Sequence, residues 1–567
     1  MPPETRNCQN CKASFTIEPE DFDFYKKIEV PPPTWCPECR LMRRLAFMNI
    51  WSLYKHDCAK CGKNVMSMYS PDKTFPVYCM PCWNADDWDG TEYAMDYDPS
   101  RPFLEQVIAL ANRTPWATLE AQYTTITNSE YTNGVAHVKN CYLIFWADYC
   151  ENAFYSSYLN GLKDSMDCYR MEGCELCYGD VGCNKCYRTF FSEECESCTD
   201  VWFSRACVGC TDCFGCVNLR NKSYYIFNEK YSKEEYFEKL KSLQLDSRAA
   251  LEGIQNRVRE FWDKHPRRAY DGNTQNVNVT GDYIYQSKNT RDAYMVTGVE
   301  DSRYIQFISV ASSKNCYDYT GWGNGAELVY ESVVTGEGVS RIKFSFECWP
   351  NSFDLEYCAY VIASKHCFGC VNLKRKEYCI LNKQYSKEEY ERLVAVIRKD
   401  IVEHPYRDAI GRVWRYGESL PLEICRFAYN EGLALPFFPK TREEALAQGF
   451  RWHEKEPARH PITKKGSEVP DTIGETDDSV LKENVGCLKC GSAFRFVPGE
   501  LALMRRFNLP LPGVCPNCRQ DARLARTNLP RFYDRNCAKC GKAIHTSYAP
   551  DRPEIVYCEQ CYQAEVA

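Results

Sequence analysis

Residues 183–210 read CNKCYRTFFSEECESCTDVWFSRACVGC, with a Cys-x-x-Cys pair at every twelfth position. The segments between these pairs repeat as well, because Tyr187–Ser192 corresponds to Thr199–Ser204. A twelve-residue unit is too short to bury its own face, so a core forms only when successive units stack. The repeat therefore predicts a parallel β-solenoid with about 4.8 Å between turns. Upstream, aromatic strand-like segments follow polar residues at similar intervals, at Asn128, Asn140, Asn152 and Ser165.

A second array occupies residues 282–372, and its end repeats the end of the first array 154 residues later. Cys213–Leu219 recurs as Cys367–Leu373, and both copies lead into the sequence Tyr-Ser-Lys-Glu-Glu-Tyr. Within these continuations, Ser232–Glu235 and Ser386–Glu389 have the spacing of a helix capping box. We therefore expect a duplicated solenoid in which each copy ends in a helical cap.

The cysteines of the solenoids differ between the two copies. At the offset of 154 residues, Cys207 and Cys210 become Val361 and Ser364. Valine and serine cannot replace thiolate ligands, but they suit a small and tightly packed interior position. The run that ends at Cys216 also differs from an iron–sulfur motif, because its last gap is two residues and no proline follows. We interpret these cysteines as buried thiols; additional zinc between adjacent pairs remains the alternative.

Sixteen further cysteines form Cys-x-x-Cys pairs near the two ends of the chain. Each C-terminal pair lies 479 positions after its N-terminal counterpart, so one module is used twice. Two residues between cysteines let one turn direct both sulfurs at an ion, and a second pair completes the tetrahedron. Four thiolates leave no open position, which indicates four structural Zn²⁺ ions in all. The expected ligands are Cys8, Cys11, Cys36, Cys39, Cys58, Cys61, Cys79, Cys82, Cys487, Cys490, Cys515, Cys518, Cys537, Cys540, Cys558 and Cys561.

The pairing of these ligands is open from spacing alone. We favour sequential sites, in which the first pair joins the second and the third joins the fourth, over an interleaved arrangement. The gap of 17 residues between Cys61 and Cys79 suits a compact ribbon. The pair at Cys36 and Cys39 runs into a helix-like segment at Leu41–Leu45, which is the arrangement of a treble clef.

Several sequence phrases are typical of one group of proteins. They are Cys8-x-x-Cys11, Phe15, Pro33, Cys36-Pro37-x-Cys39-Arg40, Cys213-Phe-Gly-Cys216-Val-Asn-Leu219, Tyr231-Ser-Lys-Glu-Glu-Tyr236 and Tyr548-Ala-Pro-Asp-Arg-Pro553. Through them the chain resembles, over nearly its full length, a family of long, cysteine-rich bacterial proteins with zinc-ribbon (treble-clef) domains. The resemblance implies zinc and a treble-clef element, and it implies no particular activity.

Both terminal modules are basic between their second and third cysteine pairs. Residues 505–542 hold nine Lys or Arg against two Asp, and residues 40–63 hold six against one Asp. Nearby aromatic rings could stack on bases, so we expect RNA or DNA to bind here. The other interpretation is that these arginines only offset the negative charge of a tetrathiolate site. The expected nucleic-acid contacts are Arg40, Arg43, Arg44, Tyr54, Arg519, Arg523, Arg526, Arg531, Tyr533 and Arg535.

Composition limits the remaining classes. The 567 residues are 44% hydrophobic and 26% charged with a net charge of −7, which is typical of a globular chain of several domains. Apolar runs fall short of the roughly 20 residues of a membrane helix, and the first residues lack a secretory signal. We therefore expect a cytoplasmic protein without a membrane partner, in which abundant cysteine indicates metal or buried thiols.

The sequence gives little support for catalysis. It contains neither a phosphate-binding Gly-x-x-x-x-Gly-Lys loop, nor a Gly-x-Gly-x-x-Gly turn, nor a His-Glu-x-x-His pair. We expect a non-enzymatic structural-zinc protein that binds nucleic acid, without a small-molecule cofactor. The alternative is a zinc-stabilised scaffold that binds a protein partner on the solenoid surface, and a carbohydrate-active β-helix enzyme ranks third.

The predicted organisation is mainly β with small helical parts. It comprises an N-terminal double zinc module (1–83), a connector with a helix (84–127), solenoid A (128–218), helical cap A (219–281), solenoid B (282–372), helical cap B (373–416), a linker (417–480) and a C-terminal double zinc module (481–567).

Overall fold

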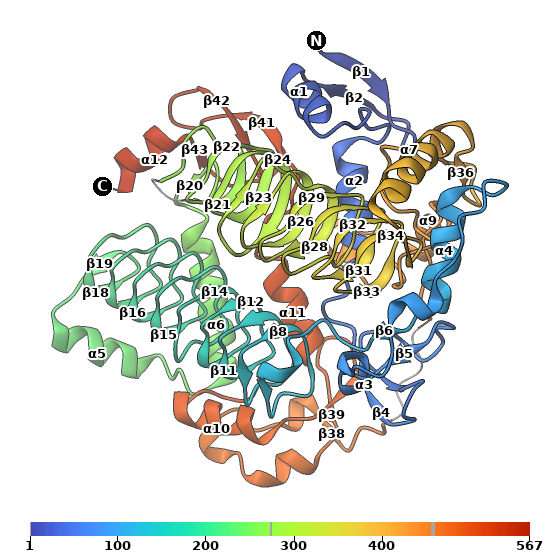
Figure 1. Cartoon of the computed structure of the whole chain (residues 1–567). Coiled ribbons are helices and arrows are strands. Elements are labelled where there is room, and N and C mark those ends of the chain that lie inside the picture. The colour runs from blue at the N-terminus through green and yellow to red at the C-terminus, as the bar shows by residue number, and fades with distance from the viewer. Residues whose placement is uncertain (1, 273–274, 455–459, 567) are drawn as a thin grey trace.

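The computed structural model describes residues 2–272, 275–454 and 460–566. Two β-solenoids lie side by side, and the terminal modules pack against them (Figure 1). The predicted fold class is confirmed: the chain is mainly β, with a duplicated solenoid, helical caps and cysteine modules near both ends. None of the described helices has both the length and the apolar character needed to cross a bilayer.

The first solenoid advances by twelve residues per turn. Thr199 pairs with Thr211 in parallel register, and isolated bridges such as Glu193 to Arg205 keep the same step between the longer strands. Strand β18 still continues this ladder, so the solenoid extends past residue 218. Its strands are β7 (Ile126–Thr127), β8 (Thr132–Ala136), β9 (Val138–Lys139), β10 (Ile144–Asp148), β11 (Glu151–Phe154), β12 (Ser157–Asn160), β13 (Lys163–Met166), β14 (Tyr169–Glu172), β15 (Tyr187–Phe190), β16 (Thr199–Trp202), β17 (Thr211–Phe214), β18 (Ser223–Ile226) and β19 (Glu229–Lys230).

The backbone of the first solenoid makes a left-handed bend at every third residue. From Asn140 to Asn152, φ angles of 50–54° recur at residues 140, 143, 146, 149 and 152. Four bends therefore complete one turn of twelve residues. The residue after each bend is buried in the interior, as at Cys141, Ile144 and Ala147. Asn, Asp and Gly tolerate left-handed φ better than most residues, which explains why they punctuate the sequence repeat.

Cysteine fills much of the narrow interior. The thirteen cysteines from Cys141 to Cys216 are each 3% exposed or less. Their Sγ–H groups donate to nearby carbonyl groups, for example from Cys186 to Asn184 at 3.4 Å. Among the described residues, no three solenoid cysteines have sulfurs that all lie within 4.8 Å of one another. This arrangement supports the interpretation as buried thiols.

The second solenoid repeats less evenly. Its register advances by 12 residues from Gly281 to Ala293, by 14 from Arg303 to Tyr317 and by 13 from Tyr317 to Tyr330. This variation explains why its sequence repeat is weaker. Its strands are β21 (Gly281–Tyr285), β22 (Lys288–Arg291), β23 (Ala293–Thr297), β24 (Val299–Ile308), β25 (Ser313–Lys314), β26 (Tyr317–Gly323), β27 (Ala326–Glu327), β28 (Tyr330–Gly336), β29 (Ser340–Lys343), β30 (Phe353–Glu356), β31 (Ala359–Ile362), β32 (Lys365–Phe368), β33 (Val371–Lys374), β34 (Glu377–Ile380) and β35 (Lys383–Gln384).

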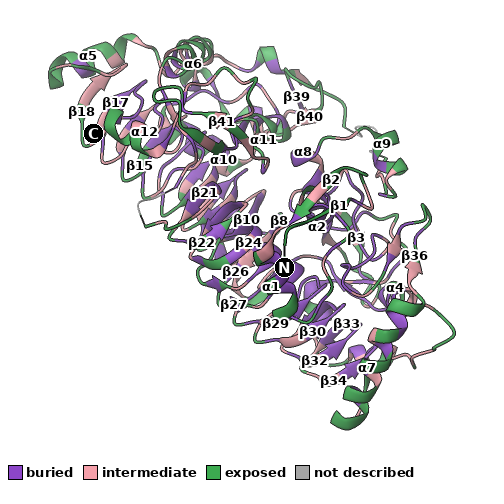
Figure 2. Cartoon of the chain, turned by 90° about the horizontal axis from the view of Figure 1, so that it is seen from above, coloured by how far each residue is buried: buried purple, intermediate pink, exposed green. Residues whose placement is uncertain are grey.

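Helices cover the solenoid ends where capping boxes were predicted. Ser232 Oγ accepts from the Glu235 amide at 3.2 Å and begins α5 (Lys233–Ser242), which contacts β18 and precedes α6 (Arg248–Trp262). Ser386 Oγ accepts from the Glu389 amide at 3.3 Å and begins α7 (Lys387–Glu403), which contacts β34. Figure 2 shows exposed α5 and α7 at opposite ends of the molecule, with buried solenoid strands between them.

The terminal modules share an order of hairpins and short helices. The N-terminal module contains β1 (Glu4–Asn7), β2 (Ser14–Ile17), α1 (Pro19–Lys27), α2 (Pro37–Ala46), β3 (Tyr54–Asp57), β4 (Asn64–Ser67), β5 (Val77–Tyr78) and α3 (Met80–Asn84). The C-terminal module contains β39 (Val485–Gly486), β40 (Ala493–Phe494), α10 (Pro498–Phe507), α11 (Pro516–Leu524), β41 (Tyr533–Asn536), β42 (Ala543–Thr546), β43 (Val556–Tyr557) and α12 (Glu559–Val566).

The connecting segments are packed into the molecule. The expected connector helix is α4 (Phe103–Arg113), followed by β6 (Trp116–Ala117). In the segment predicted as a linker, Ile424 and Phe427 are buried, and the Leu433 amide donates to the Met48 carbonyl at 2.7 Å. Residues 420–450 therefore add to the core of the N-terminal module, whereas Val469, Ile473 and Val480 pack with the C-terminal module. Its elements and their neighbours are β36 (Tyr406–Arg407), β37 (Val413–Trp414), α8 (Ala434–Phe437), α9 (Arg442–Ala447) and β38 (Lys464–Lys465).

Candidate metal centres and the cleft between the solenoids

The sixteen terminal cysteines form four groups of four. In each group the four sulfur atoms lie within 4.8 Å of one another, and two successive Cys-x-x-Cys pairs supply them. The arrangement is the sequential one that we expected, and not the interleaved one. The groups are Cys8, Cys11, Cys36 and Cys39; Cys58, Cys61, Cys79 and Cys82; Cys487, Cys490, Cys515 and Cys518; and Cys537, Cys540, Cys558 and Cys561.

The dimensions of these groups suit a tetrahedral metal ion. The Sγ atoms of Cys11 and Cys36 are 3.7 Å apart, and those of Cys61 and Cys79 are 3.8 Å apart. The matching distances in the C-terminal module are 3.7 Å and 3.8 Å. A tetrahedron with metal–sulfur bonds of about 2.3 Å has edges of about 3.8 Å. Each group can therefore hold one metal ion, and four thiolate donors are the typical ligand set of structural zinc.

Turns and helix starts direct the sulfur atoms toward the centre of each group. Cys36 and Cys515 are the N-caps of α2 and α11, and a proline follows each of them at the first helical position. Proline is favoured there because its ring fixes φ and its missing N–H has no helical partner. The positive end of the helix dipole also stabilises a thiolate at that position. After another knuckle, Gly62 adopts a φ of 72°, a left-handed turn that suits glycine.

Backbone amides donate hydrogen bonds to the sulfurs. The amides of Cys36, Cys79 and Cys515 each donate to the Sγ of the cysteine that opens their group, at 3.2 Å. Burial opposes ionisation of Cys58, but donation from the Cys79 and Cys61 amides outweighs it and lowers the pKa of Cys58 to about 6. These amides therefore support the thiolate form that binds metal.

The predicted nucleic-acid face of the N-terminal module lies inside the molecule. Arg40, Arg43 and Arg44 are each 1% exposed. Arg40 and Arg44 pair with Asp318 at 2.9 Å, and Arg43 pairs with Glu331 at 3.0 Å. This finding corrects the prediction, because these arginines hold α2 against the second solenoid and do not face solvent.

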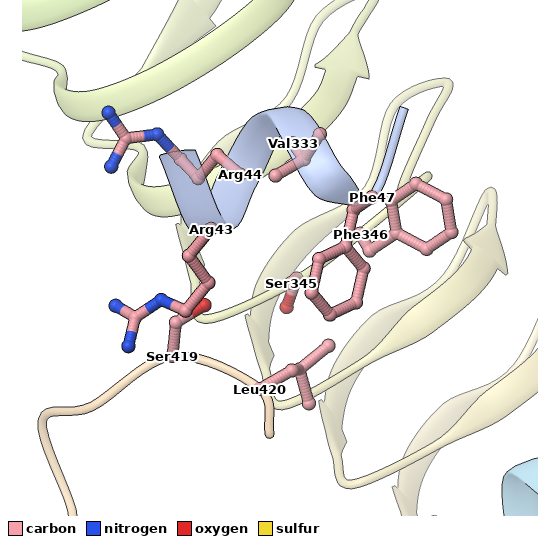
Figure 3. Close-up of a pocket in the computed structure, with 8 residues that line it drawn as sticks. All are labelled: Arg43, Arg44, Phe47, Val333, Ser345, Phe346, Ser419 and Leu420. Carbon is pink, nitrogen blue, oxygen red and sulfur yellow. The ribbon is translucent and has the colours of Figure 1, made fainter. Parts of the chain in front are cut away.

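Figure 3 shows how closely α2 packs there. Arg43 and Arg44 extend from the helix, and Phe47 lies beside Phe346 of the second solenoid. The cavity beside them has a volume of about 10 Å³, which is room for about one water molecule. The place where α2 meets the solenoid is therefore a packed internal contact.

The arginines of α11 likewise form buried ion pairs, here with the first solenoid and α10. Arg519 and Arg523 are 7% and 5% exposed. Arg519 pairs with Glu500 at 3.0 Å and with Asp167 at 3.1 Å, and Arg523 pairs with Asp167 at 2.6 Å. The helical face predicted to bind phosphates is therefore directed at the acidic groups of β13–β14 and α10. Arg526, further along, pairs with Glu193 at 2.6 Å.

The other four predicted contacts are dispersed. Arg531 is partly exposed and pairs with Glu38 of the opposite module at 2.6 Å. Arg535 donates to the carbonyl groups of residues 549 and 554 within its own module. Tyr54 packs against His453, and Tyr533 is half-buried. All eight predicted arginines thus contact partners within the chain.

The sequence of α2 contains a signal that its arginines are buried. Leu41, Met42 and Leu45 alternate with the arginines of α2 and are 4% exposed or less, so the helix is buried on every side. An arginine in such a helix needs an internal carboxylate. The shared offset of 479 residues shows that Arg40 corresponds to Arg519 in the second module. It does not identify the acidic partners, because these come from the solenoids.

A cleft of about 980 Å³ separates the two solenoids. Sequence reasoning missed it, because its lining residues come from segments far apart in the chain. Both terminal modules contribute to its wall as well as the solenoids. Representative lining residues are Asp148, Glu172, Trp322, Trp349, Trp83 and Tyr548.

Two buried carboxyl groups meet in the wall of this cleft. Glu120 precedes the first solenoid and is 8% exposed, whereas Glu347 belongs to the second and is 2% exposed. Their side chains interact, and the burial of both groups favours a proton shared between them. Burial raises the pKa of Glu120 to about 7, and burial together with the neighbouring Glu120 raises the pKa of Glu347 above its usual range.

Comparisons with known proteins do not place the chain in a family. No protein-family model and no curated protein matches it. One similar solved structure is titled "putative acetyltransferase" from Desulfovibrio desulfuricans G20, with 11% identity and a TM-score of 0.10. The match covers 51% of this chain and 74% of the other. A TM-score that low carries no inference about fold or activity.

Proposed function

We propose that this chain is a non-enzymatic scaffold in which four structural zinc ions fix two modules, and that it binds a ligand in the cleft between the solenoids. The observation that carries the proposal is the cleft of about 980 Å³, whose wall includes both solenoids and both modules. That volume lies at the upper end of the range for small-molecule sites.

The position of the modules links zinc to the cleft. Trp83 lies in α3, directly after Cys82, and Tyr562 lies directly after Cys561 in α12. Both aromatic residues line the cleft. Loss of a metal ion would release the short helix that positions each ring, because modules of this size depend on zinc for folding.

We do not extend the proposal to nucleic-acid binding by the terminal modules. That expectation required exposed arginines, and the arginines of α2 and α11 are engaged with Asp318, Glu331 and Asp167. A phosphate backbone would have to displace these buried ion pairs, each of which is costly to break.

A blocked cleft tests the proposal. Ala206 lines the cleft on the first solenoid and is partly exposed, so Ala206→Trp would obstruct it there. Thermal unfolding of the intact protein would be screened against nucleotides, organic acids, oligosaccharides and peptides. We expect at least one class to stabilise the wild type and the control Glu175→Trp, which lies outside the cleft, but not Ala206→Trp. Equal binding to Ala206→Trp would reject this part of the cleft as the binding site.

A further inference from the structure

The cleft contains a buried arginine that lacks an anionic partner. Arg205 is 1% exposed and lines the cleft. Its Nε and Nη2 atoms are buried without a hydrogen-bond partner. Within the described residues, no carboxylate oxygen lies within 4.0 Å of its guanidinium, although Glu193 and Glu194 attract it from further away. A buried guanidinium without a directly paired carboxylate is unfavourable, because its loss of hydration is only partly offset.

Other buried arginines of this chain are treated differently. Arg40, Arg519 and Arg523 each face a carboxylate at 3.1 Å or less. Arg426 also has unpartnered nitrogens, but it donates to Asn112 at 2.7 Å and does not line the cleft. Arg205 therefore stands out as a charge that is both unpaired and directed at open volume.

Of the two carboxyl groups near Arg205, one is paired with another arginine and the other has a raised pKa. Glu193, one turn below it in register, accepts from Arg526 at 2.6 Å. Burial and the neighbouring Asp271 raise the pKa of Glu194 to about 7, so this carboxyl group is partly protonated at neutral pH. Neither residue approaches Arg205 closely enough to form an ion pair among the described contacts.

Further cations and aromatic rings surround this end of the cleft. Arg170 lines it, stacks on the Tyr283 ring at 3.8 Å and leaves its own Nε without a partner. Among the described residues, it forms one ion pair, which is long at 3.4 Å and joins it to Asp271. Arg267 and Tyr548 complete the wall from outside the first solenoid. Guanidinium groups bind phosphate and carboxylate through two parallel hydrogen bonds.

We propose that the Arg205 end of the cleft binds the phosphate or carboxylate group of an anionic small molecule, with Arg205 as its principal partner and Arg170 beside it. This inference rests on the proposed function, since it names the chemical class of the ligand that the cleft takes. Phosphate and carboxylate offer the same paired oxygens, and the choice between them is made by the probes.

The test uses the full-length zinc-loaded protein with three probes: inorganic phosphate, adenosine monophosphate and succinate. Titration calorimetry would compare the wild type with Arg205→Met and with Arg188→Met, a control whose exposed side chain pairs with Asp200 outside the cleft. We expect at least one probe to bind the wild type and the control. Loss of a charge-assisted contact would weaken that binding about 10- to 100-fold in Arg205→Met.

Thermal unfolding without any probe gives a second readout. Because Arg205→Met removes an unpaired buried charge, we expect it to unfold at a higher temperature than the wild type. A lower unfolding temperature would mean that Arg205 is paired inside the protein, and it would overturn the proposal. If Arg205→Met does not fold, Arg205→Lys is used in its place, because lysine keeps the positive charge but cannot form two parallel hydrogen bonds. Unchanged probe binding in Arg205→Lys would also overturn the proposal.

The outcomes separate this inference from the function beneath it. Binding of phosphate and adenosine monophosphate without succinate assigns a phosphate, and the reverse assigns a carboxylate. If no probe binds, or if a neutral ligand is blocked by Ala206→Trp and unaffected by Arg205→Met, the anion proposal fails. In the second case the cleft itself remains the binding site.

Discussion

Replacing Glu347 by glutamine should make the protein less sensitive to alkaline pH. In the wild type, Glu120 and Glu347 interact inside the protein, where burial favours a proton shared between them. An unfolded glutamate titrates near 4.5, whereas burial raises the pKa of Glu120 to about 7 and raises that of Glu347 above its usual range. Between these values the folded state binds more protons than the unfolded state, so the free energy of unfolding falls as pH rises.

The size of this effect follows from proton linkage. Each proton held only by the folded state lowers the free energy of unfolding by about 1.4 kcal/mol per pH unit. In Glu347→Gln the amide can donate to Glu120, and the titration of residue 347 is removed. We therefore expect the variant to gain about 2 kcal/mol relative to the wild type between pH 6 and pH 8, a range chosen because stronger acid protonates zinc ligands.

Urea unfolding followed by tryptophan fluorescence at pH 6, 7 and 8 measures this difference. Glu388→Gln, on the exposed face of α7, is the control, and it should follow the wild type at every pH. If Glu347→Gln weakened the protein by the same amount at all three pH values, Glu347 would be an ionised partner of some cation. The shared-proton interpretation would then be refuted.

Two further predictions concern the ion pairs between the C-terminal module and the first solenoid, and the cysteine thiols. Arg523→Met should lower the free energy of unfolding by about 2 kcal/mol, because buried Asp167 keeps only its longer ion pair with Arg519 and the Tyr155 carbonyl loses a charged donor. Exposed Arg506→Met should change it by less than about 1 kcal/mol. Equal urea midpoints for the two variants would contradict this. Elemental analysis should find one metal ion fewer in Cys490→Ser and an unchanged content in Cys186→Val; a lost ion in Cys186→Val would mean that solenoid thiols bind metal.

Parts of this fold are readable from the sequence because they depend on local repetition. The step of twelve residues and the Ser232 and Ser386 capping boxes each specify a nearby structure. The four-cysteine groups are equally local, since each joins two successive pairs. The bend at every third residue was accessible too, because small residues such as Ala147 and Cys150 recur at the buried positions.

The remaining features depend on contacts between distant segments. Whether Arg44 faces solvent is decided by Asp318, which is 274 residues away. Similarly, Arg523 meets Asp167 across 356 residues. Neither acid has a sequence mark that would identify it as a partner. The cleft is of the same kind, because its wall combines both solenoids with both modules, and no single segment encodes it.

The central claim is that structural zinc in four cysteine groups holds the modules that clamp the solenoids together. Native mass spectrometry of the intact chain, before and after treatment with a strong chelator, tests it most directly. We predict the mass of four zinc ions per chain, and a broadened, more highly charged distribution once the chelator removes them. Fewer than four ions, or a charge distribution unchanged after complete metal removal, would contradict the claim.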